Sequence, residues 1–254
     1  MTKQSKSVNS QASLTKSDRH ADARDDNIPQ QYQKGYAEFY KLKFKVTPDV
    51  LIPRPETELL VDEVLNYYTL NPIPYTLLDI GTGAGNIAIA LACNLKACLP
   101  ARQGCNVKII AADVSAKALK VAKQNVKLHG VENQITFIQS NLLSNIIFSR
   151  SRSFDIIVTN LPYIPSARIP YLDSSVKDFE PLVALDGGDD GFDLYRKLFA
   201  QIKEKGWNPK LIVGEIDYTH GELAINEAEK YFPDSRVEVK TDLTHRQRIL
   251  KITN

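Results

Sequence analysis

The sequence predicts an α/β fold whose central sheet is mostly parallel and twisted, with helices on both faces. Short apolar segments typical of strands alternate with segments of helical periodicity from residue 75 to residue 232. Repeats of strand, helix and strand have right-handed crossovers, which bring the strands together in parallel. The last two strand-like segments, 236–240 and 248–252, have no helix between them and predict an antiparallel strand pair at one edge.

The elements before the sheet are predicted to be short. Residues 1–34 contain only three Val, Leu or Ile residues, too little apolar surface to offset the entropy of ordering, so a disordered or mobile tail is expected there. Lysines alternate with apolar residues over 41–46, the pattern of a strand with one face in solvent. Residues 35–70 are therefore expected to form a short β-hairpin and a lead-in helix, which begins after the stiff Ile52–Pro55 connector.

Residues 71–254 are the expected main domain. Strands are predicted at 76–80, 108–112, 135–139, 154–159 and 211–216, and helices at 86–97, 116–129, 192–205 and 221–232. The irregular stretch from 161 to 191 is too long for a simple connector. Such a loop usually serves a site.

The composition argues against several function classes. A formal net charge of +2 and 24 % charged residues are ordinary for a soluble globular protein, so direct binding of nucleic acid is not expected. Cys93, Cys98 and Cys105 form neither a Cys-x-x-Cys pair nor a cluster with histidine, so no metal site is predicted. No apolar stretch approaches the ~20 residues of a spanning helix, and no secretory signal is found, so a cytoplasmic location without a membrane partner is expected.

A glycine-rich loop follows the first strand of the main domain. In Asp79-Ile80-Gly81-Thr82-Gly83-Ala84-Gly85, the glycines allow the backbone to approach a small ligand closely. The spacing is neither that of a Gly-x-Gly-x-x-Gly dinucleotide loop nor that of a P-loop. The Asp79 carboxylate would repel a pyrophosphate but attract an ammonium or sulfonium group, so the loop indicates a positively charged cofactor. The alternative is a tight turn that binds no ligand.

Asp113 ends the next predicted strand. A carboxylate at that place can accept hydrogen bonds from both hydroxyls of a ribose, which favours a nucleoside cofactor. Alternatively, Asp113 caps the helix that follows, although Ser115 competes for that role.

The tetrad Asn160-Leu161-Pro162-Tyr163 closes the predicted strand at 154–159. A carboxamide and an aromatic ring held at a strand tip suit a flat, amide-like nitrogen. Beside a cationic cofactor, this pair predicts methylation of a planar nitrogen. Asn160 could instead form a turn, and Tyr163 could be a core aromatic.

With these residues the chain resembles the S-adenosylmethionine-dependent class I methyltransferases and, among them, the HemK-type release factor glutamine methyltransferases. The resemblance runs from about Gly35 to Lys251. The glycine loop alone indicates only the cofactor class. Two further segments point to the subfamily: the Pro-Arg-Pro segment, Leu51-Ile52-Pro53-Arg54-Pro55-Glu56-Thr57-Glu58, and the Asp-Gly-Gly segment, Ala184-Leu185-Asp186-Gly187-Gly188-Asp189-Asp190-Gly191.

The resemblance implies a Rossmann-like fold and a reaction in translation termination. Its substrate would be the glutamine of the Gly-Gly-Gln tripeptide in peptide chain release factors, methylated on the side-chain amide nitrogen by S-adenosyl-L-methionine. The implied cofactor contacts are Gly81–Gly85, Asp113 for the ribose, Asn141 and Leu142 beside the adenine, and Asn160. The tetrad Asn160–Tyr163 would hold the glutamine.

Three departures from the family pattern are visible. Leu161 replaces the first proline of the common Asn-Pro-Pro-Tyr signature, which keeps the carbonyl but loses the fixed φ. Asn141 stands where an acidic residue is common, and it can still accept from an adenine amino group without charge assistance. The family's N-terminal helical domain is not expected in residues 1–34, so either the remaining loops dock the release factor or the substrate is a different protein glutamine.

The expected chemistry needs acceptors rather than a strong base, because the amide lone pair is delocalised. The Asn160 side-chain oxygen and the Leu161 carbonyl can each accept one N–H of the substrate amide, and the Tyr163 ring can pack on the planar group. No residue is nominated as general base. The candidates His129, His220 and His245 are expected at the surface.

Two other functions fit part of the pattern. A nucleic-acid base methyltransferase would use the same Asn-x-Pro-Tyr arrangement for exocyclic amino groups. Its basic patch would comprise Lys41, Lys43, Lys45, Arg150 and Arg152, but the near-neutral charge argues against it. A non-catalytic relative that only binds the cofactor is the second alternative.

Overall fold

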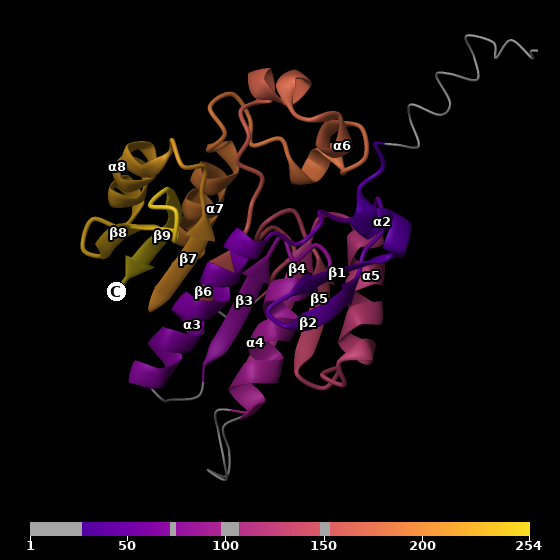
Figure 1. Ribbon diagram of the computed structural model, residues 1–254. Helices are drawn as coiled ribbons and strands as arrows, with labels where there is room; N and C mark the ends of the chain where they lie inside the picture. The colour runs from indigo at the N-terminus through magenta and orange to yellow at the C-terminus, as the bar shows by residue number, and fades with distance from the viewer. Residues whose placement is uncertain (1–26, 72–74, 98–106, 148–152) are drawn as a thin grey trace, which may run out of the picture.

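The computed structural model describes residues 27–71, 75–97, 107–147 and 153–254. Within them, a seven-stranded sheet has the order β5-β4-β3-β6-β7-β9-β8 (Figure 1). Its strands are β3 (Thr76–Ile80), β4 (Lys108–Asp113), β5 (Ile135–Gln139), β6 (Ile156–Thr159), β7 (Leu211–Glu215), β8 (Arg236–Thr241) and β9 (Gln247–Thr253). Strands β3 to β7 pair in parallel, whereas β9 pairs antiparallel with β7 and β8. The predicted sheet and its antiparallel edge pair are confirmed.

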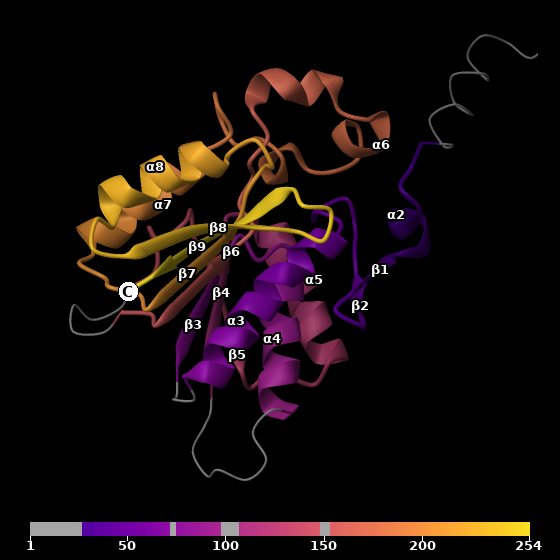
Figure 2. The ribbon, with the colours of Figure 1, turned by 60° about the vertical axis from the view of Figure 1, so that its left-hand side comes forward.

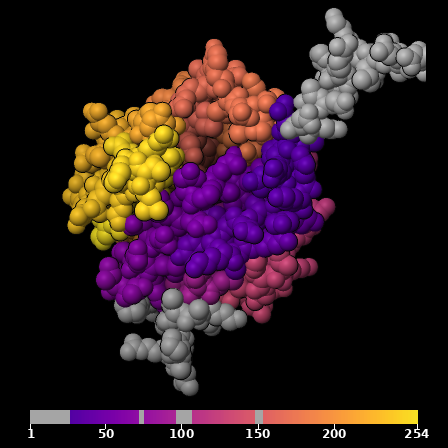
Figure 3. Space-filling view, viewed as in Figure 1, coloured from indigo at the N-terminus to yellow at the C-terminus, as the bar shows by residue number. Residues whose placement is uncertain are grey.

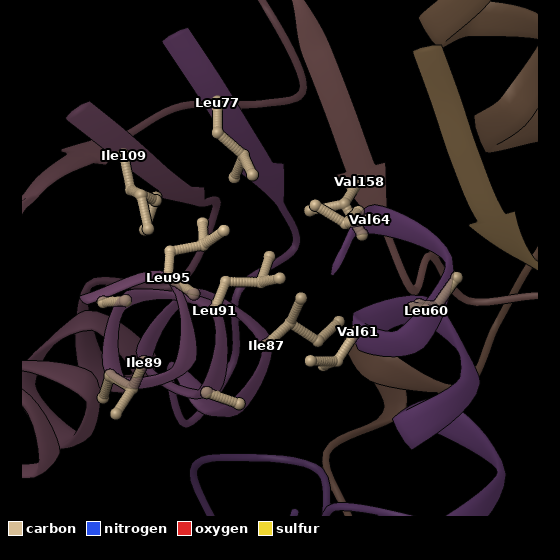
Figure 4. Packing of buried hydrophobic residues seen from close by; sticks show 14 of the residues in the cluster. Leu60, Val61, Val64, Leu77, Ile87, Ile89, Leu91, Leu95, Ile109 and Val158 are labelled. Atoms are coloured by element: carbon tan, nitrogen blue, oxygen red, sulfur yellow. The ribbon is translucent and has the colours of Figure 1, made fainter. Parts of the chain in front are cut away.

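Helices cover both faces of the sheet, as predicted (Figure 2). They are α3 (Glu58–Leu70), α4 (Asn86–Ala97), α5 (Ala116–Leu128), α7 (Asp193–Glu204) and α8 (Gly221–Tyr231). Neighbouring residues of one strand point to opposite faces, so Leu77 packs in the cluster with α3 and α4 while Leu78 packs in the cluster with α7 and α8. Figure 4 shows the first cluster, where Val61 of α3 and Leu91 of α4 lie beneath Leu77 and Val158.

A small antiparallel sheet precedes the main one. It pairs β1 (Tyr36–Phe39) with β2 (Leu42–Lys45), and the lysines of 41–46 are exposed while Phe44 is buried, as the alternation predicted. The expected tail of residues 1–34 was wrong at its end, because α2 occupies Gln30–Lys34. This helix is anchored by an aromatic residue, Tyr32, which a count of Val, Leu and Ile does not include. The Tyr32 hydroxyl donates to the Val50 carbonyl at 2.6 Å. Residues 1–26 of that tail lie outside the described residues.

The stretch between β6 and α7, residues 161–191, is called the insert below. It was expected to be irregular but contains three short helical segments: η2 (Ser166–Tyr171), α6 (Ser174–Lys177) and η3 (Leu182–Ala184). In Figure 3 the insert, in salmon, lies against the indigo N-terminal part of the chain. The buried carboxylate of Glu180 joins the two, since it pairs with Arg54 and accepts from the Ile52 N–H at 3.2 Å.

Candidate active site

The predicted site residues gather at one edge of the sheet. Strands β4, β3 and β6 are neighbours and parallel, so their carboxyl ends lie side by side. Gly81 follows β3, Asp113 ends β4 and Asn160 follows β6. A cavity of about 540 Å³ opens at these ends, within the usual size of a small-molecule site.

Most of the predicted site residues line this cavity. They are Gly81, Thr82, Gly83, Ala84, Asp113, Asn141, Leu142, Asn160, Leu161 and Pro162. Asp79, Gly85 and Tyr163 do not border it. A Cβ on Gly85 would lie 3.2 Å from the Ala122 Cβ, so this glycine permits close packing of the loop on α5. The proposed cofactor and substrate contacts of Asp79, Gly85 and Tyr163 stay predictions.

The glycine loop and the tetrad lie directly against each other. Gly81 and Gly83 have φ angles of +71° and +54°, in a region of backbone conformation that residues with a Cβ rarely adopt. A Cβ added to Gly81 would lie 3.6 Å from the Asn160 carbonyl oxygen. A ligand held by the loop would therefore be next to Asn160.

Asp79 carries an unsatisfied acceptor behind the loop. Its Oδ2 accepts from the Thr82 hydroxyl at 2.6 Å, whereas its buried Oδ1 has no hydrogen-bond partner within the described part of the chain. Burial raises the pKa of Asp79 to about 7, although the Thr82 hydroxyl and the Ala88 backbone N–H oppose that shift. A nearby cation would favour the ionised form, so this carboxylate fits a positively charged ligand.

Asp113 ties the glycine loop to β4. Its Oδ2 accepts from the Gly83 N–H at 2.8 Å and its Oδ1 from the Ser115 N–H at 2.8 Å. Burial raises the pKa of Asp113, and these backbone donors oppose the shift. Ser115 caps α5, since its hydroxyl oxygen accepts from the Ala118 N–H at 3.1 Å, so the alternative role of Asp113 as the cap of that helix is wrong.

In the tetrad, the two ends of the Asn160 amide differ in their contacts. Its Nδ2 donates to the Thr57 hydroxyl oxygen at 3.1 Å, whereas its Oδ1 has no hydrogen-bond partner among the described residues. Leu161 is only 3 % exposed and packs in the cluster with α7, so the leucine that replaces the family's proline fills a core position. The Tyr163 hydroxyl donates to the Glu215 carboxylate at 2.9 Å.

Sequence reasoning missed two residues of the site, Thr57 and Glu215. The Thr57 hydroxyl donates to the Glu215 Oε2 at 2.6 Å, and these residues are 2 % and 1 % exposed. Burial raises the pKa of Glu215, while the hydrogen bonds and Arg248 oppose the shift. One signal could have revealed Glu215: it is the carboxylate that ends the otherwise apolar strand beside β6.

The Asp-Gly-Gly segment packs on the back of the tetrad. A Cβ on Gly187 would lie 2.8 Å from the Pro162 carbonyl oxygen, which is closer than real Cβ atoms approach, so this position requires glycine. The Gly187 N–H donates to the Ile164 carbonyl at 2.9 Å. Both segments that carry the subfamily resemblance therefore contact the tetrad, one through Thr57 and one through Gly187.

The three histidines within the described residues contribute no candidate base. His220 was expected at the surface but is 5 % exposed, because it packs edge-on against Phe192 at the start of α8. His129 lies 2.9 Å from the Lys43 carbonyl oxygen, and His245 is exposed. None of the three lines the cavity.

The remaining sequence predictions concern metals, membranes and charge. The described residues contain no group of three or more His, Cys, Asp or Glu side chains arranged to hold a metal ion. Within the same residues, no helix has the length and apolar character needed to cross a membrane. Cys98, Cys105, Arg150 and Arg152 lie outside the described part.

Comparison with known proteins identifies the family. Residues 74–218 match the family model described as a methyltransferase domain. The chain is 36 % identical to the release factor glutamine methyltransferase of Dictyoglomus turgidum, over 91 % of this chain and 77 % of that protein. It is 42 % identical to the protein of that name in Moorella thermoacetica, over 70 % of this chain and 58 % of the relative.

A solved structure with the same fold is the N-terminal domain of human METTL16 in complex with SAH. The TM-score is 0.55 at 13 % identity, over 95 % of this chain and 84 % of that one. The fold, the converging motifs and the sequence relatives agree with the expected family. The chain belongs to the release factor glutamine methyltransferases.

Proposed function

We propose that this protein transfers a methyl group from S-adenosyl-L-methionine to the side-chain amide nitrogen of the glutamine in the Gly-Gly-Gln tripeptide of a peptide chain release factor. One observation supports this most directly. The Asn160 side chain borders the cavity with its Nδ2 committed to Thr57, which leaves Oδ1 as a preorganised acceptor beside the glycine loop.

The residues present fit the proposed cofactor. Gly81 and Gly83 allow close approach of a ligand, Asp113 keeps lone pairs for ribose hydroxyls, and the unsatisfied Asp79 oxygen favours a cation. Asn141 and Leu142 line the part of the cavity proposed for the adenine. When bound, S-adenosylmethionine supplies an electrophilic methyl group on a sulfonium centre.

The chain's own contribution is to orient a poor nucleophile. Asn160 Oδ1 and the Leu161 carbonyl each accept one N–H of the glutamine amide, which aims the nitrogen lone pair and stabilises the positive charge that develops on it. Orientation of this kind can lower a barrier by about 7 to 11 kcal/mol. No histidine borders the cavity within the described residues, and the proton leaves to water after transfer.

The substrate is a protein, so the cavity needs an accessible rim. Leu182 and Val183 of the insert line the cavity and are 58 % and 57 % exposed, which makes them candidates to contact the release factor around its glutamine. We place the methyltransferase domain in residues 71–254 and the reaction in the cytoplasm, without a membrane or nucleic-acid partner.

The direct test incubates the protein with labelled S-adenosylmethionine and the release factors of its host. Mass spectrometry of the product should locate a single methyl group on the Gly-Gly-Gln glutamine. Transfer to RNA or DNA but not to release factor would instead support the base methyltransferase, and cofactor binding without any transfer would support the non-catalytic relative.

Replacing Asp113 with alanine should weaken cofactor binding without abolishing it. The change removes charge-assisted hydrogen bonds worth about 1.5 to 3 kcal/mol, so the Kd should rise roughly tenfold to a hundredfold in calorimetric titration. Asp234→Ala, at an exposed turn after α8, is the matched control. An unchanged Kd would remove Asp113 from the cofactor site.

A further inference from the structure

We propose that Glu215 is a positioning residue that, acting through Thr57, fixes which atom of the Asn160 amide faces the substrate. The inference rests on the proposed function, because it concerns the atom that accepts from the substrate glutamine. Glu215 itself does not line the cavity.

Three contacts form one chain from Glu215 to the cavity. Thr57 Oγ1 lies 2.6 Å from Glu215 Oε2 and 3.1 Å from Asn160 Nδ2. Glu215 belongs to β7, which pairs in parallel with β6, so the carboxyl ends of both strands lie together. Thr57 reaches them from the Pro-Arg-Pro segment, 103 residues before Asn160.

The direction of these bonds follows from counting protons. Thr57 has one hydroxyl proton, and an ionised carboxylate can only accept, so that proton is given to Glu215. The Thr57 oxygen is then left as an acceptor toward Asn160 and must meet the Nδ2 end of the amide. Asn160 Oδ1 therefore faces away from Thr57, free to accept from a substrate N–H.

Without this constraint the Asn160 amide could turn over. Its oxygen and nitrogen ends have nearly the same shape, so packing alone distinguishes them poorly. The turned amide would direct its N–H groups at the N–H groups of a substrate glutamine. Two donors cannot form a hydrogen bond with each other. Productive binding therefore requires the orientation that Glu215 enforces.

A carboxylate is the group that this position requires. Glu215 accepts from two hydroxyls at once, that of Thr57 on Oε2 and that of Tyr163 on Oε1. A glutamine at 215 would offer one acceptor and one donor end, and its donor end could reverse the bond to Thr57. Burial raises the pKa of Glu215, whereas the hydrogen bonds from Thr57 and Tyr163 and the nearby Arg248 favour its charged form. Burying the Glu215 carboxylate costs free energy, but its two hydrogen bonds fix the hydroxyls of Thr57 and Tyr163 and so the orientation of the tetrad.

The main variant removes the hydroxyl and keeps the shape. Thr57→Val should lower kcat on release factor by about 10²-fold, the usual result of misplacing a reacting group, with the cofactor Kd unchanged. Thr57→Ser keeps the hydroxyl and should restore kcat to within about threefold of wild type. Thr76→Val is the matched control: it also removes a hydroxyl that lies 3.0 Å from a carboxylate, that of Asp155, but at the amino end of β3.

A second measurement distinguishes a change in the orientation of the Asn160 amide from a general loss of structure in the variant. A peptide with Gly-Gly-Glu carries a carboxylate that can only accept, so wild type should bind it far more weakly than Gly-Gly-Gln. In Thr57→Val the amide can turn and donate, so this preference should shrink by about tenfold or more. Glu215→Gln should shrink the preference in the same way and serves if Thr57→Val does not fold.

The outcomes are distinct. The inference is overturned if wild type methylates release factor while Thr57→Val keeps wild-type kcat and the same glutamine preference. Wild type that fails to methylate release factor would overturn the proposed function instead. Loss of kcat in Thr57→Val with rescue by serine and a reduced preference supports both.

Discussion

Replacing Asn160 with alanine is expected to give a protein that folds and still binds the cofactor, but whose turnover is lower by about 10² to 10³-fold, the scale for removing one preorganised partner of a transition state. The side chain is only half-buried, and the one hydrogen bond that it makes to a described residue, Thr57, does not hold secondary structure together. The measurement is kcat on release factor, accompanied by thermal unfolding and by calorimetric titration of the cofactor.

Asn160→Asp is a stringent companion to the alanine variant. An aspartate has the same shape, but its ionised carboxylate cannot donate to Thr57, so the orientation of the side chain would be lost along with neutrality. Turnover of either variant within about threefold of wild type would remove Asn160 from the chemistry.

The second large effect is a pH dependence of cofactor affinity that originates at Asp79. Burial raises the pKa of Asp79 to about 7 in the ligand-free protein, so at lower pH this carboxyl holds a proton. A bound sulfonium favours the ionised form, so binding then requires release of that proton. The affinity for S-adenosylmethionine should fall by up to about tenfold for each unit of pH below 7.

S-adenosylhomocysteine is the natural control for this effect, because it lacks the sulfonium charge. Its Kd should change less over the same pH range, and Asp79→Asn should remove the slope for both ligands. The sign for stability is opposite: only the folded state holds the proton between the ordinary pKa of 3.8 and about 7, so the ligand-free protein loses stability as pH rises through this window. A Kd for S-adenosylmethionine that is flat from about pH 6 to 8 would contradict the assignment.

The main sheet and its helices could be predicted because their signals are local. A parallel strand is covered on both faces, so it leaves a continuous apolar run such as Ile156–Val158. Helix α4 begins directly after the glycine loop, and its predicted range of 86–97 coincides with the observed one. Motifs at strand ends then locate the cavity, because neighbouring parallel strands end at the same edge.

The parts that could not be predicted depend on contacts distant in sequence. Thr57 and Glu215 are 158 residues apart, and only the strand order, which puts β7 beside β6, brings Glu215 to the tetrad. Helix α2 is anchored by a hydrogen bond from Tyr32 to Val50, which composition alone does not reveal. The burial of His220 likewise follows from its packing against Phe192 rather than from its neighbours in the chain.

The most direct test is a crystal structure of the protein with S-adenosylhomocysteine and a release factor or Gly-Gly-Gln peptide. We expect Asn160 Oδ1 and the Leu161 carbonyl oxygen within hydrogen-bond distance of the glutamine amide nitrogen, about 2.7 to 3.2 Å, with Asn160 Nδ2 still on Thr57. A glutamine bound elsewhere, or an Asn160 side chain turned away from the cofactor, would contradict the account.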